Sequence, residues 1–175
     1  MDHQIFADTP GLNQALFQVT HGLYILTSVV GEKINGQCLD SLMQVTNMPP
    51  RIAIGVGKRS LTHEMIVESG IFAANAIDRE CIACYDMVKH FGFQSGRKVD
   101  KFANIAYVKG ELGAPILPDS KAFFECRIVR ELTLDLGTHS LFVAQVERAG
   151  TQAQGEPLTY NEYRRVMKRG MKEGG

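Results

Sequence analysis

The feature that most restricts the fold of this chain is a succession of strand-forming runs joined by short turns. The run Leu23–Val30, LYILTSVV, is rich in the β-branched and aromatic residues that pack well on a pleated surface. The next segment, Gly31–Gly36, holds two glycines and an asparagine, which accept positive φ and favour a chain reversal. We therefore expect a β-hairpin whose second strand starts near Gln37.

The second strand, expected over Gln37–Thr46, has an unusually polar face. Because side chains alternate along a strand, one face carries Cys38, Asp40, Leu42, Gln44 and Thr46. A carboxylate and an amide on such a face either point into water, which is the commoner arrangement, or contact a polar ligand. Pairing within the hairpin brings Thr27 and Ser28 close to this strand.

A polar loop, Lys58–Thr62, follows the next strand-like run, RIAIGVG, and leads into a helix that ends at Gly70. The loop offers two cations, two hydroxyl groups and the free backbone N–H groups of a helix start, and together these bind phosphate well. The alternative is that Ser60 only caps the helix, and caps are far commoner than anion sites. The residues alone favour the cap and leave the phosphate site open.

Shorter elements fill much of the remaining chain. The apolar spacing in Gly11–His21 predicts a helix that caps one end of the sheet, and Ile71–Ile77 predicts another short strand. A second helix is expected over Arg79–Phe91, followed by a loop through FGFQSGRKVDKF, and a last short helix over residues 160–171. The phenylalanines of that loop form either a hydrophobic plug or a lid over a flat ring.

Three further strands are expected over residues 106–117, 122–136 and 139–150. In the middle one, Phe124 and Cys126 alternate with Glu125 and Arg127. This alternation is typical of a strand with one face in water, so we place the charged residues on the solvated face.

So many strands, joined by short turns and few helices, indicate a mainly β protein. We expect a small antiparallel barrel with short flanking helices, forming one domain over residues 1–175. Neither a βαβ rhythm nor a GxGxxG sequence is present, so a dinucleotide-binding doubly wound sheet is not expected.

Composition narrows the partners and the compartment. Lys plus Arg equals Asp plus Glu, 19 each, so no net charge attracts nucleic acid or an anionic membrane. No apolar run approaches the roughly 20 residues that span a bilayer. The N-terminal segment MDHQIFADTP lacks the basic and apolar regions of a secretory signal. We expect a cytoplasmic protein with small or neutral partners.

Four cysteines stand at positions 38, 81, 84 and 126, and only Cys81 and Cys84 form a close pair. In a reducing compartment a disulfide framework is not expected, and no clustered His or Cys completes a metal site, so none is predicted. The pair lies in a helical segment, where residues i and i+3 share a face. Two buried thiols are the favoured interpretation, with a redox pair as the alternative.

Two features near the C-terminus complete the pattern. His139 stands at the entrance of the last expected strand, where an imidazole is well placed beside a ligand, although a lone histidine is more often structural or solvated. Tyr160 and Tyr163 share a face of the last helix, and that face packs on the barrel or on a second subunit.

Together these segments resemble one known family. NGQ, QVT, PPRIAI and KRSLTHEMI, then FGFQSGRKVDKF, GTHSLFV and PLTYNEY, occur in the order typical of the flavin reductase-like, FMN-binding split-barrel family. The likeness runs from about Leu23 to Tyr163 and is particularly strong to flavoredoxins and to the flavin reductase domain of high-molecular-weight rubredoxins. It implies a homodimeric antiparallel Greek-key barrel that binds FMN noncovalently at or near the subunit interface.

The resemblance also implies a site. The strand from Cys38 to Thr46 lies along the isoalloxazine and ribityl chain, the loop Lys58–Thr62 holds the 5′-phosphate, and His139 lies on the nicotinamide side. This reverses the preference for a plain cap. The residues implied to hold the cofactor are Thr27, Ser28, Cys38, Leu39, Asp40, Ser41, Gln44, Thr46, Lys58, Ser60 and Thr62, with Phe91, Phe93 and Arg97 at the lid.

The implied activity is hydride transfer from NADH or NADPH to FMN, followed by electron transfer to free flavin or a small redox protein. The alternatives are an FMN electron carrier without NAD(P)H activity and a barrel for another ligand, such as a pyridoxal derivative or haem. Leu39-Asp40-Ser41 departs from the small residues usual in relatives, and an acid beside flavin is expected to change electron transfer. The cysteine pair Cys81 and Cys84 is also unusual for the family, which leaves its redox role open.

Overall fold

The computed structural model of the protein describes the backbone of residues 3–173 and the side chains of residues 3–167. The strands of the main sheet are β1 (Tyr24–Val30), β2 (Lys33–Leu39), β3 (Leu42–Asn47), β4 (Pro50–Gly57), β5 (Ile71–Ala76), β8 (Ala122–Ile128), β9 (Leu134–Asp135) and β10 (His139–Thr151). A separate hairpin consists of β6 (Val108–Lys109) and β7 (Pro115–Ile116). The helices are α1 (Thr9–Leu16), α2 (Leu61–Ser69), α3 (Ile82–Phe93) and α4 (Tyr160–Glu173), with a 3₁₀ turn at Arg130–Leu132.

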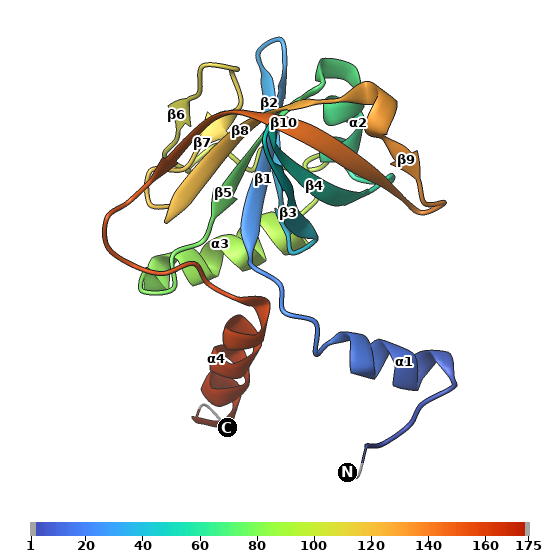
Figure 1. Cartoon of the computed structure of the whole chain (residues 1–175). Helices are drawn as coiled ribbons and strands as arrows, with labels where there is room; N and C mark the ends of the chain where they lie inside the picture. The colour runs from blue at the N-terminus through green and yellow to red at the C-terminus, as the bar shows by residue number, and fades with distance from the viewer. Residues whose placement is uncertain (1–2, 174–175) are drawn as a thin grey trace.

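The main sheet has eight strands and is antiparallel throughout. Neighbouring strands follow the order β2-β1-β5-β8-β10-β4-β3, with β9 beside β10. The sheet curls into a barrel, and the helices lie around it rather than between its strands (Figure 1). The predicted mainly β architecture with short flanking helices is confirmed.

The first hairpin is tighter than predicted. Val30 of β1 pairs with Lys33 of β2, so the turn consists of Gly31 and Glu32 alone. Gly31 has φ 58°, the positive value that the first residue of a two-residue hairpin loop commonly needs. Asn35, which was expected in the turn, lies inside β2.

The single strand predicted over Gln37–Thr46 is wrong, because the chain bends at Asp40-Ser41. Leu39 is 6% exposed and Leu42 packs against the same core cluster. Residues three positions apart face opposite sides of a regular strand, so both can point inward only if the strand breaks between them. β2 then pairs with β1 at one edge of the sheet and β3 with β4 at the other. The bend joins these edges without a continuous ladder, which gives the barrel its split.

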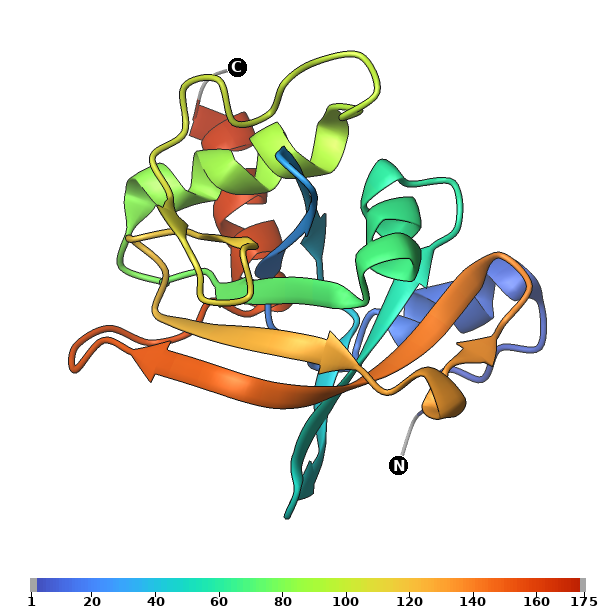
Figure 2. The ribbon, with the colours of Figure 1, turned by 90° about the horizontal axis from the view of Figure 1, so that it is seen from above.

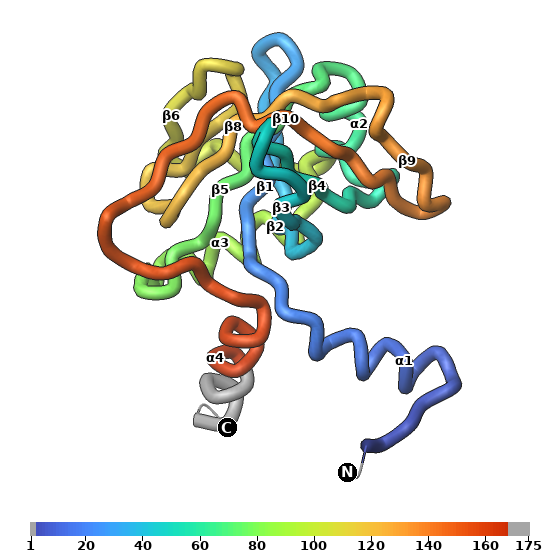
Figure 3. Tube along the Cα trace, viewed as in Figure 1, coloured from blue at the N-terminus to red at the C-terminus, as the bar shows by residue number. Residues whose placement is uncertain are grey.

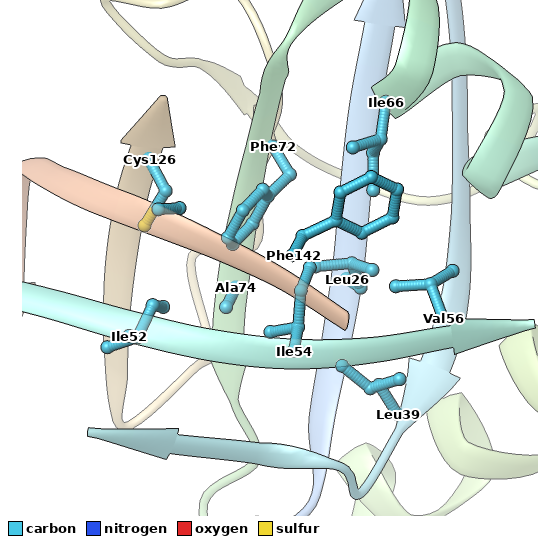
Figure 4. Packing of buried hydrophobic residues seen from close by; sticks show 11 residues of the cluster. Leu26, Leu39, Ile52, Ile54, Val56, Ile66, Phe72, Ala74, Cys126 and Phe142 are labelled. Atoms are coloured by element: carbon cyan, nitrogen blue, oxygen red, sulfur yellow. The ribbon is translucent and has the colours of Figure 1, made fainter. Parts of the chain in front are cut away.

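One cluster of apolar side chains fills the barrel. Leu26, Ile54, Phe72 and Cys126 are each fully buried, and Phe142 is 3% exposed. They come from β1, β4, β5, β8 and β10 and converge between the strands (Figure 4). Full burial of a large apolar side chain contributes about 1.5–3 kcal/mol, so this cluster is the main source of the barrel's stability.

Glu125 of β8 corrects the predicted alternation. Its side chain is fully buried rather than solvated, although its neighbour Arg127 is exposed. The β6–β7 hairpin covers it: the Leu112 N–H donates to Glu125 Oε1 at 2.9 Å, and a Cβ on Gly110 would collide with the carboxylate. The covering hairpin is built from residues outside β8, so the pattern of the strand does not reveal it.

Helices α2 and α3 pack on β1 and β2, respectively. A second apolar cluster joins α3 and the C-terminal segment, and it contains Val88, Phe91, Leu158 and Tyr163. Tyr163 stacks on Tyr85 of α3 with ring centroids 6.0 Å apart. The tyrosine face of the last helix was predicted to pack on the barrel or on a second subunit. Within this chain it packs on the barrel side, through α3 and the second apolar cluster.

The prediction that the N-terminal helix caps the sheet is wrong. Helix α1 extends beyond the barrel, on the same side as α4 (Figures 1 and 3). Leu12, Leu16, Phe17 and Val19 are 48%, 61%, 48% and 50% exposed. One contact toward α4 comes from Phe17, whose ring lies 4.4 Å from the Arg164 guanidinium. The apolar spacing of this segment predicted a helix packed on a core, but within the described chain its apolar face stays largely exposed.

The prediction of two buried thiols at Cys81 and Cys84 is also wrong, because a disulfide joins them. Cys38 and Cys126 are free. No helix within residues 3–173 is long and apolar enough to cross a lipid bilayer.

Candidate functional site

Two distant segments meet where β2 bends into β3. The Gly55 N–H of β4 donates a hydrogen bond to the Ser41 carbonyl oxygen, 2.9 Å away. A Cβ on Gly55 would lie 3.4 Å from the Ser41 Cβ, an ordinary contact distance, so the two segments are in direct contact. Ser41 Oγ donates to Asp40 Oδ1 at 3.0 Å, Ser41 is exposed and Asp40 is half-buried. The bend thus presents a hydroxyl and a carboxylate beside the end of β4.

The loop after β4 runs alongside the start of β10. The Lys58 N–H donates to the Thr138 carbonyl oxygen at 3.0 Å, and His139 pairs with Gly57 across the two strands. His139 Nε2 would lie 3.5 Å from a Cβ on Gly57. The predicted phosphate loop and the predicted histidine are therefore neighbours.

The start of α2 leaves backbone donors free. Ser60 is the N-cap of this helix, and its Oγ accepts from the His63 N–H at 3.1 Å. Within the described chain, the N–H groups of Arg59, Leu61 and Thr62 have no hydrogen-bond acceptor. Free N–H groups and the helix dipole together favour an anion at this position. The cap and the anion site are therefore compatible rather than alternatives.

Lys58 adds a positive charge to this loop. Its Nζ lies 2.5 Å from Asp135 Oδ1, with the two side chains 33% and 71% exposed. The Lys58 ammonium, together with the Gly137 N–H, holds the pKa of the Asp135 carboxyl below its ordinary value. Exposed ion pairs contribute little to stability, so Lys58 can exchange the carboxylate for a phosphate at small cost.

Thr62 supports the loop from inside the protein. Its side chain is fully buried, and Oγ1 accepts from Asn35 Nδ2 at 2.9 Å. Asn35 is 4% exposed, and a Cβ on Gly96 would collide with it, so it ties β2, α2 and the loop after α3 together. Sequence reasoning missed Asn35 because Asn-Gly is a turn signal. A direct phosphate contact from Thr62 stays a prediction.

Other predicted site residues are also buried. The Thr27 hydroxyl donates to the Pro115 carbonyl oxygen at 2.6 Å, and the Ser28 hydroxyl donates to that of Ile71 at 2.7 Å. Leu39 belongs to the barrel core, and Phe91 is 1% exposed in the second cluster. These side chains hold the fold, and their contact with a cofactor stays a prediction.

Gln44 and Thr46 lie on the β3–β4 hairpin, which projects from the barrel (Figure 2). Both are exposed, and both are tied to the tip of the hairpin: Gln44 Nε2 bonds Asn47 Oδ1, and Thr46 Oγ1 donates to the Pro49 carbonyl oxygen at 2.5 Å. They line a groove of about 440 Å³ between the hairpin and the barrel wall. Gln44 and Thr46 therefore lie toward the tip of the β3–β4 hairpin, whereas the loop at Lys58 follows the opposite end of β4.

Cys38 and the lid candidates lie near the C-terminal end of α3. A Cβ on Gly92 would lie 3.5 Å from the Cys38 Cβ. Burial, and next the charge of Asp40, raises the pKa of Cys38 to about 12, so it is a neutral thiol. Phe93 is 82% exposed, and Arg97 pairs with Glu64 of α2. These residues form a rim next to β2 rather than a closed lid.

Lys101 is a buried cation that sequence reasoning missed. It is 4% exposed, and its Nζ donates to the carbonyl oxygens of Gly36 and Phe91, each at 2.9 Å. Burial lowers the pKa of Lys101. It lies in a stretch rich in charges, GRKVDKF, where the sequence pattern indicates only a solvated loop.

Comparison with known proteins identifies the family of the chain. Residues 16–168 match the model of the flavin reductase like domain. The chain is 42% identical over 158 residues to the high molecular weight rubredoxin of Moorella thermoacetica, covering 90% of this chain and 67% of that protein. It is 32% identical over 158 residues to the NAD(P)H ferric-chelate reductase of Archaeoglobus fulgidus, covering 90% of each.

Solved structures show the same fold. The flavoredoxin of Methanosarcina acetivorans superposes with a TM-score of 0.75 at 27% identity, covering 90% of this chain and 82% of that one. The NADH:FAD oxidoreductase of Streptomyces globisporus C-1027 reaches 0.80 at 23% identity, covering 90% and 93%.

These matches place the chain among flavin-dependent oxidoreductases. It belongs to the flavin reductase-like family and is a flavin reductase by class. The predicted family, fold and enzyme class are confirmed.

His63 gives this region a pH dependence. Its Nε2 lies 2.8 Å from Ser140 Oγ, and burial, followed by the nearby charge of Lys58, lowers its pKa below the ordinary 6.5. The unfolded chain therefore binds a proton more readily than the folded protein. We predict that the free energy of unfolding is unaffected by His63 above pH 6.5 and falls as the pH drops below it, until the folded pKa is passed.

Urea unfolding of the wild type and of His63→Gln across this pH range measures the effect. The glutamine keeps a hydrogen-bonding group without titrating, so the variant should lose part of the slope, while the exposed His3→Gln should keep it. An unchanged slope in His63→Gln would contradict the prediction.

Proposed function

We propose that the flavin of this protein is FMN, bound across the Asp40-Ser41 bend, β3 and the loop at Lys58. The observation that carries the proposal is the cradle formed by Lys58 and the free backbone N–H groups of Arg59 and Leu61, next to the polar bend at Asp40-Ser41. The cradle suits one phosphate group, and the hydroxyl and carboxylate of the bend suit the polar edge of an isoalloxazine ring. When bound, a flavin accepts hydride from a reduced nicotinamide and passes electrons onward.

The chain's own residues would bind and orient the reactants. His139 lies on the surface that also holds the loop, and Thr138 Oγ1, 2.9 Å from its Nδ1, fixes the ring so that Nε2 faces Gly57. We place His139 beside the nicotinamide, where it would hold a proton near the reacting edge. Asp40 would contact the ring as a negative charge. Such a charge disfavours a reduced anionic flavin by Coulomb repulsion, so it would lower the reduction potential.

The electron donor and acceptor follow from the same class. We propose NADH or NADPH as donor, supported by the relative named NAD(P)H ferric-chelate reductase. We propose free flavin or a small redox protein as acceptor, and similarity to a rubredoxin supports the second. The alternative, an FMN carrier without its own nicotinamide activity, is supported by similarity in fold to flavoredoxin.

We also infer that the protein is a cytoplasmic homodimer. Helix α1 has 8 residues, too few to be stable alone in water, and it exposes an apolar face. The projecting β3–β4 hairpin exposes Met43, Val45 and Met48, at 55%, 45% and 94%. A second copy of the chain would bury both surfaces and cover the open side of the flavin site.

The reductase and the carrier differ in one measurement. We expect rapid loss of the oxidised-flavin absorbance when the FMN-loaded protein is mixed with NADH or NADPH in a stopped-flow instrument, because the flavin surface is open to a nicotinamide. The control is free FMN without protein. If neither nucleotide reduces the bound flavin, the reductase is excluded and the FMN electron carrier is the remaining function.

Lys58 and Arg59 form a matched pair for testing the phosphate cradle. Lys58→Ala should weaken FMN binding by roughly tenfold to a hundredfold, because hydrogen bonds to charged groups typically contribute about 1.5–3 kcal/mol. Arg59→Ala removes an exposed cation next in sequence and should have a much smaller effect. Titration of apoprotein with FMN gives both dissociation constants, and an unchanged affinity in Lys58→Ala would place the phosphate elsewhere.

Leu16 tests the role of α1 in the dimer. Leu16→Glu puts a charge on the exposed apolar face and should raise the dimer dissociation constant at least about tenfold, because burying an unpaired charge is costly. Gln14→Glu adds the same charge to the same helix and should leave assembly intact. Sedimentation equilibrium reports both, and a wild-type monomer would refute the dimer.

A further inference from the structure

The Cys81–Cys84 disulfide stands at the start of α3, away from the flavin site. Cys81 is the N-cap residue and Cys84 lies in the first turn, with their Cα atoms 5.2 Å apart. A helix rises about 1.5 Å per residue, so Cys84 is roughly 12 Å along α3 from Gly92, which faces Cys38. The disulfide is therefore placed to react with molecules from solvent rather than with the proposed flavin.

The two sulfurs differ in accessibility. Cys81 is half-buried, whereas Cys84 is 7% exposed and packs in the second apolar cluster. Cys81, which packs at the edge of that cluster, is thus the more exposed of the two residues and the easier one for an incoming thiolate to reach. The reduced form of Cys84 would have a hydrogen-bond partner, because its Sγ lies 3.7 Å from the Asp119 carbonyl oxygen, which can accept from its S–H.

The surroundings provide apolar contacts for a ligand. Ile82, between the two cysteines, is 83% exposed. A cavity of about 140 Å³ adjoins the pair on the other side, and it is lined by Cys84, Met87, Ile105 and Leu117 among others. An exposed isoleucine and an apolar cavity therefore flank the disulfide.

Stability does not explain this disulfide. It closes a loop with a sequence separation of 3, which restricts the unfolded chain little, and the barrel has its own large core. In the cytoplasm, where we place the protein, disulfides are usually catalytic or redox-sensing rather than structural. A CxxC pair at a helix N-terminus is the arrangement in which one cysteine becomes a reactive thiolate.

We propose that Cys81 and Cys84 form a second redox centre, which exchanges electrons with a dithiol that carries an apolar chain. One thiolate of the substrate attacks Cys81 Sγ, the Cys81–Cys84 bond breaks, and Cys84 leaves as a thiolate that takes up the substrate's proton. The second substrate thiolate then displaces Cys81 from the mixed disulfide. The substrate ends as a disulfide and the protein as a dithiol, with two electrons and two protons transferred.

The test uses the native full-length protein with dihydrolipoamide and dithiothreitol as apolar and polar dithiols. Acid quenching, maleimide labelling and peptide mass spectrometry follow each cysteine. Cys81 and Cys84 should become labelled together as the dithiol reduces them without denaturant, while Cys126, a free thiol from the start, should be labelled equally at every time point. Dihydrolipoamide should reduce the Cys81–Cys84 disulfide faster than dithiothreitol does. The ratio of these two rates should exceed the ratio measured when the same two dithiols reduce oxidised glutathione. A pair that is reduced only in urea overturns the proposal, and an equal ratio overturns the apolar substrate.

Single variants assign the attacked sulfur. Cys84→Ser should form a mixed disulfide with oxidised lipoamide through Cys81, and Cys81→Ser should react at least about tenfold more slowly, because Cys84 is buried. Cys126→Ala is the matched control and should leave reduction of the pair unchanged. Equal rates in the two serine variants overturn the assignment. Circular dichroism shows whether either serine variant is misfolded. In that case, reduction of the wild-type disulfide, compared without and with urea, still decides the proposal.

Discussion

The inward packing of both Leu39 and Leu42 is the constraint on which the rest of the molecule depends. Residues three apart cannot share one face of a strand, so the chain breaks at Asp40-Ser41 and crosses from one edge of the sheet to the other. The Gly55 N–H then holds the crossing segment against β4. The core thereby decides where a polar, partly exposed bend appears, and this bend faces the loop that suits phosphate.

Local patterns predicted what depends on local chemistry. β1 and β5 followed from runs of β-branched and apolar residues, and α2 followed from Ser60 at its start and Gly70 at its end. The proposal that the loop at Lys58 binds an anion also rests on local chemistry, since cations, hydroxyls and a helix start are neighbours in sequence. The family was predicted from several motifs that occur in a fixed order along most of the chain. No single motif would have identified it.

What the sequence could not predict depends on residues far apart in the chain. Glu125 looks solvated until the hairpin carrying Leu112 covers it, and Asn35 looks like a turn residue until Thr62 is beside it. The face of α1 has the right period for burial, yet within the described chain it stays largely exposed. Cys81 and Cys84 have the spacing of one helical turn, and this spacing alone does not distinguish two thiols from a bonded pair.

Lys101 has a consequence for how this protein can change over evolution. Its ammonium binds the carbonyl oxygens of Gly36 and Phe91, so the chain between Phe91 and Lys101 starts and ends at fixed, buried points. The stretch between these anchors, which includes Phe93 and Arg97, is mostly exposed. Substitutions at the exposed positions of this stretch would leave β2 and α3 in place, whereas a side chain at Gly96 would collide with Asn35 of β2. This segment is therefore where such a barrel can acquire a new substrate preference without first losing its fold.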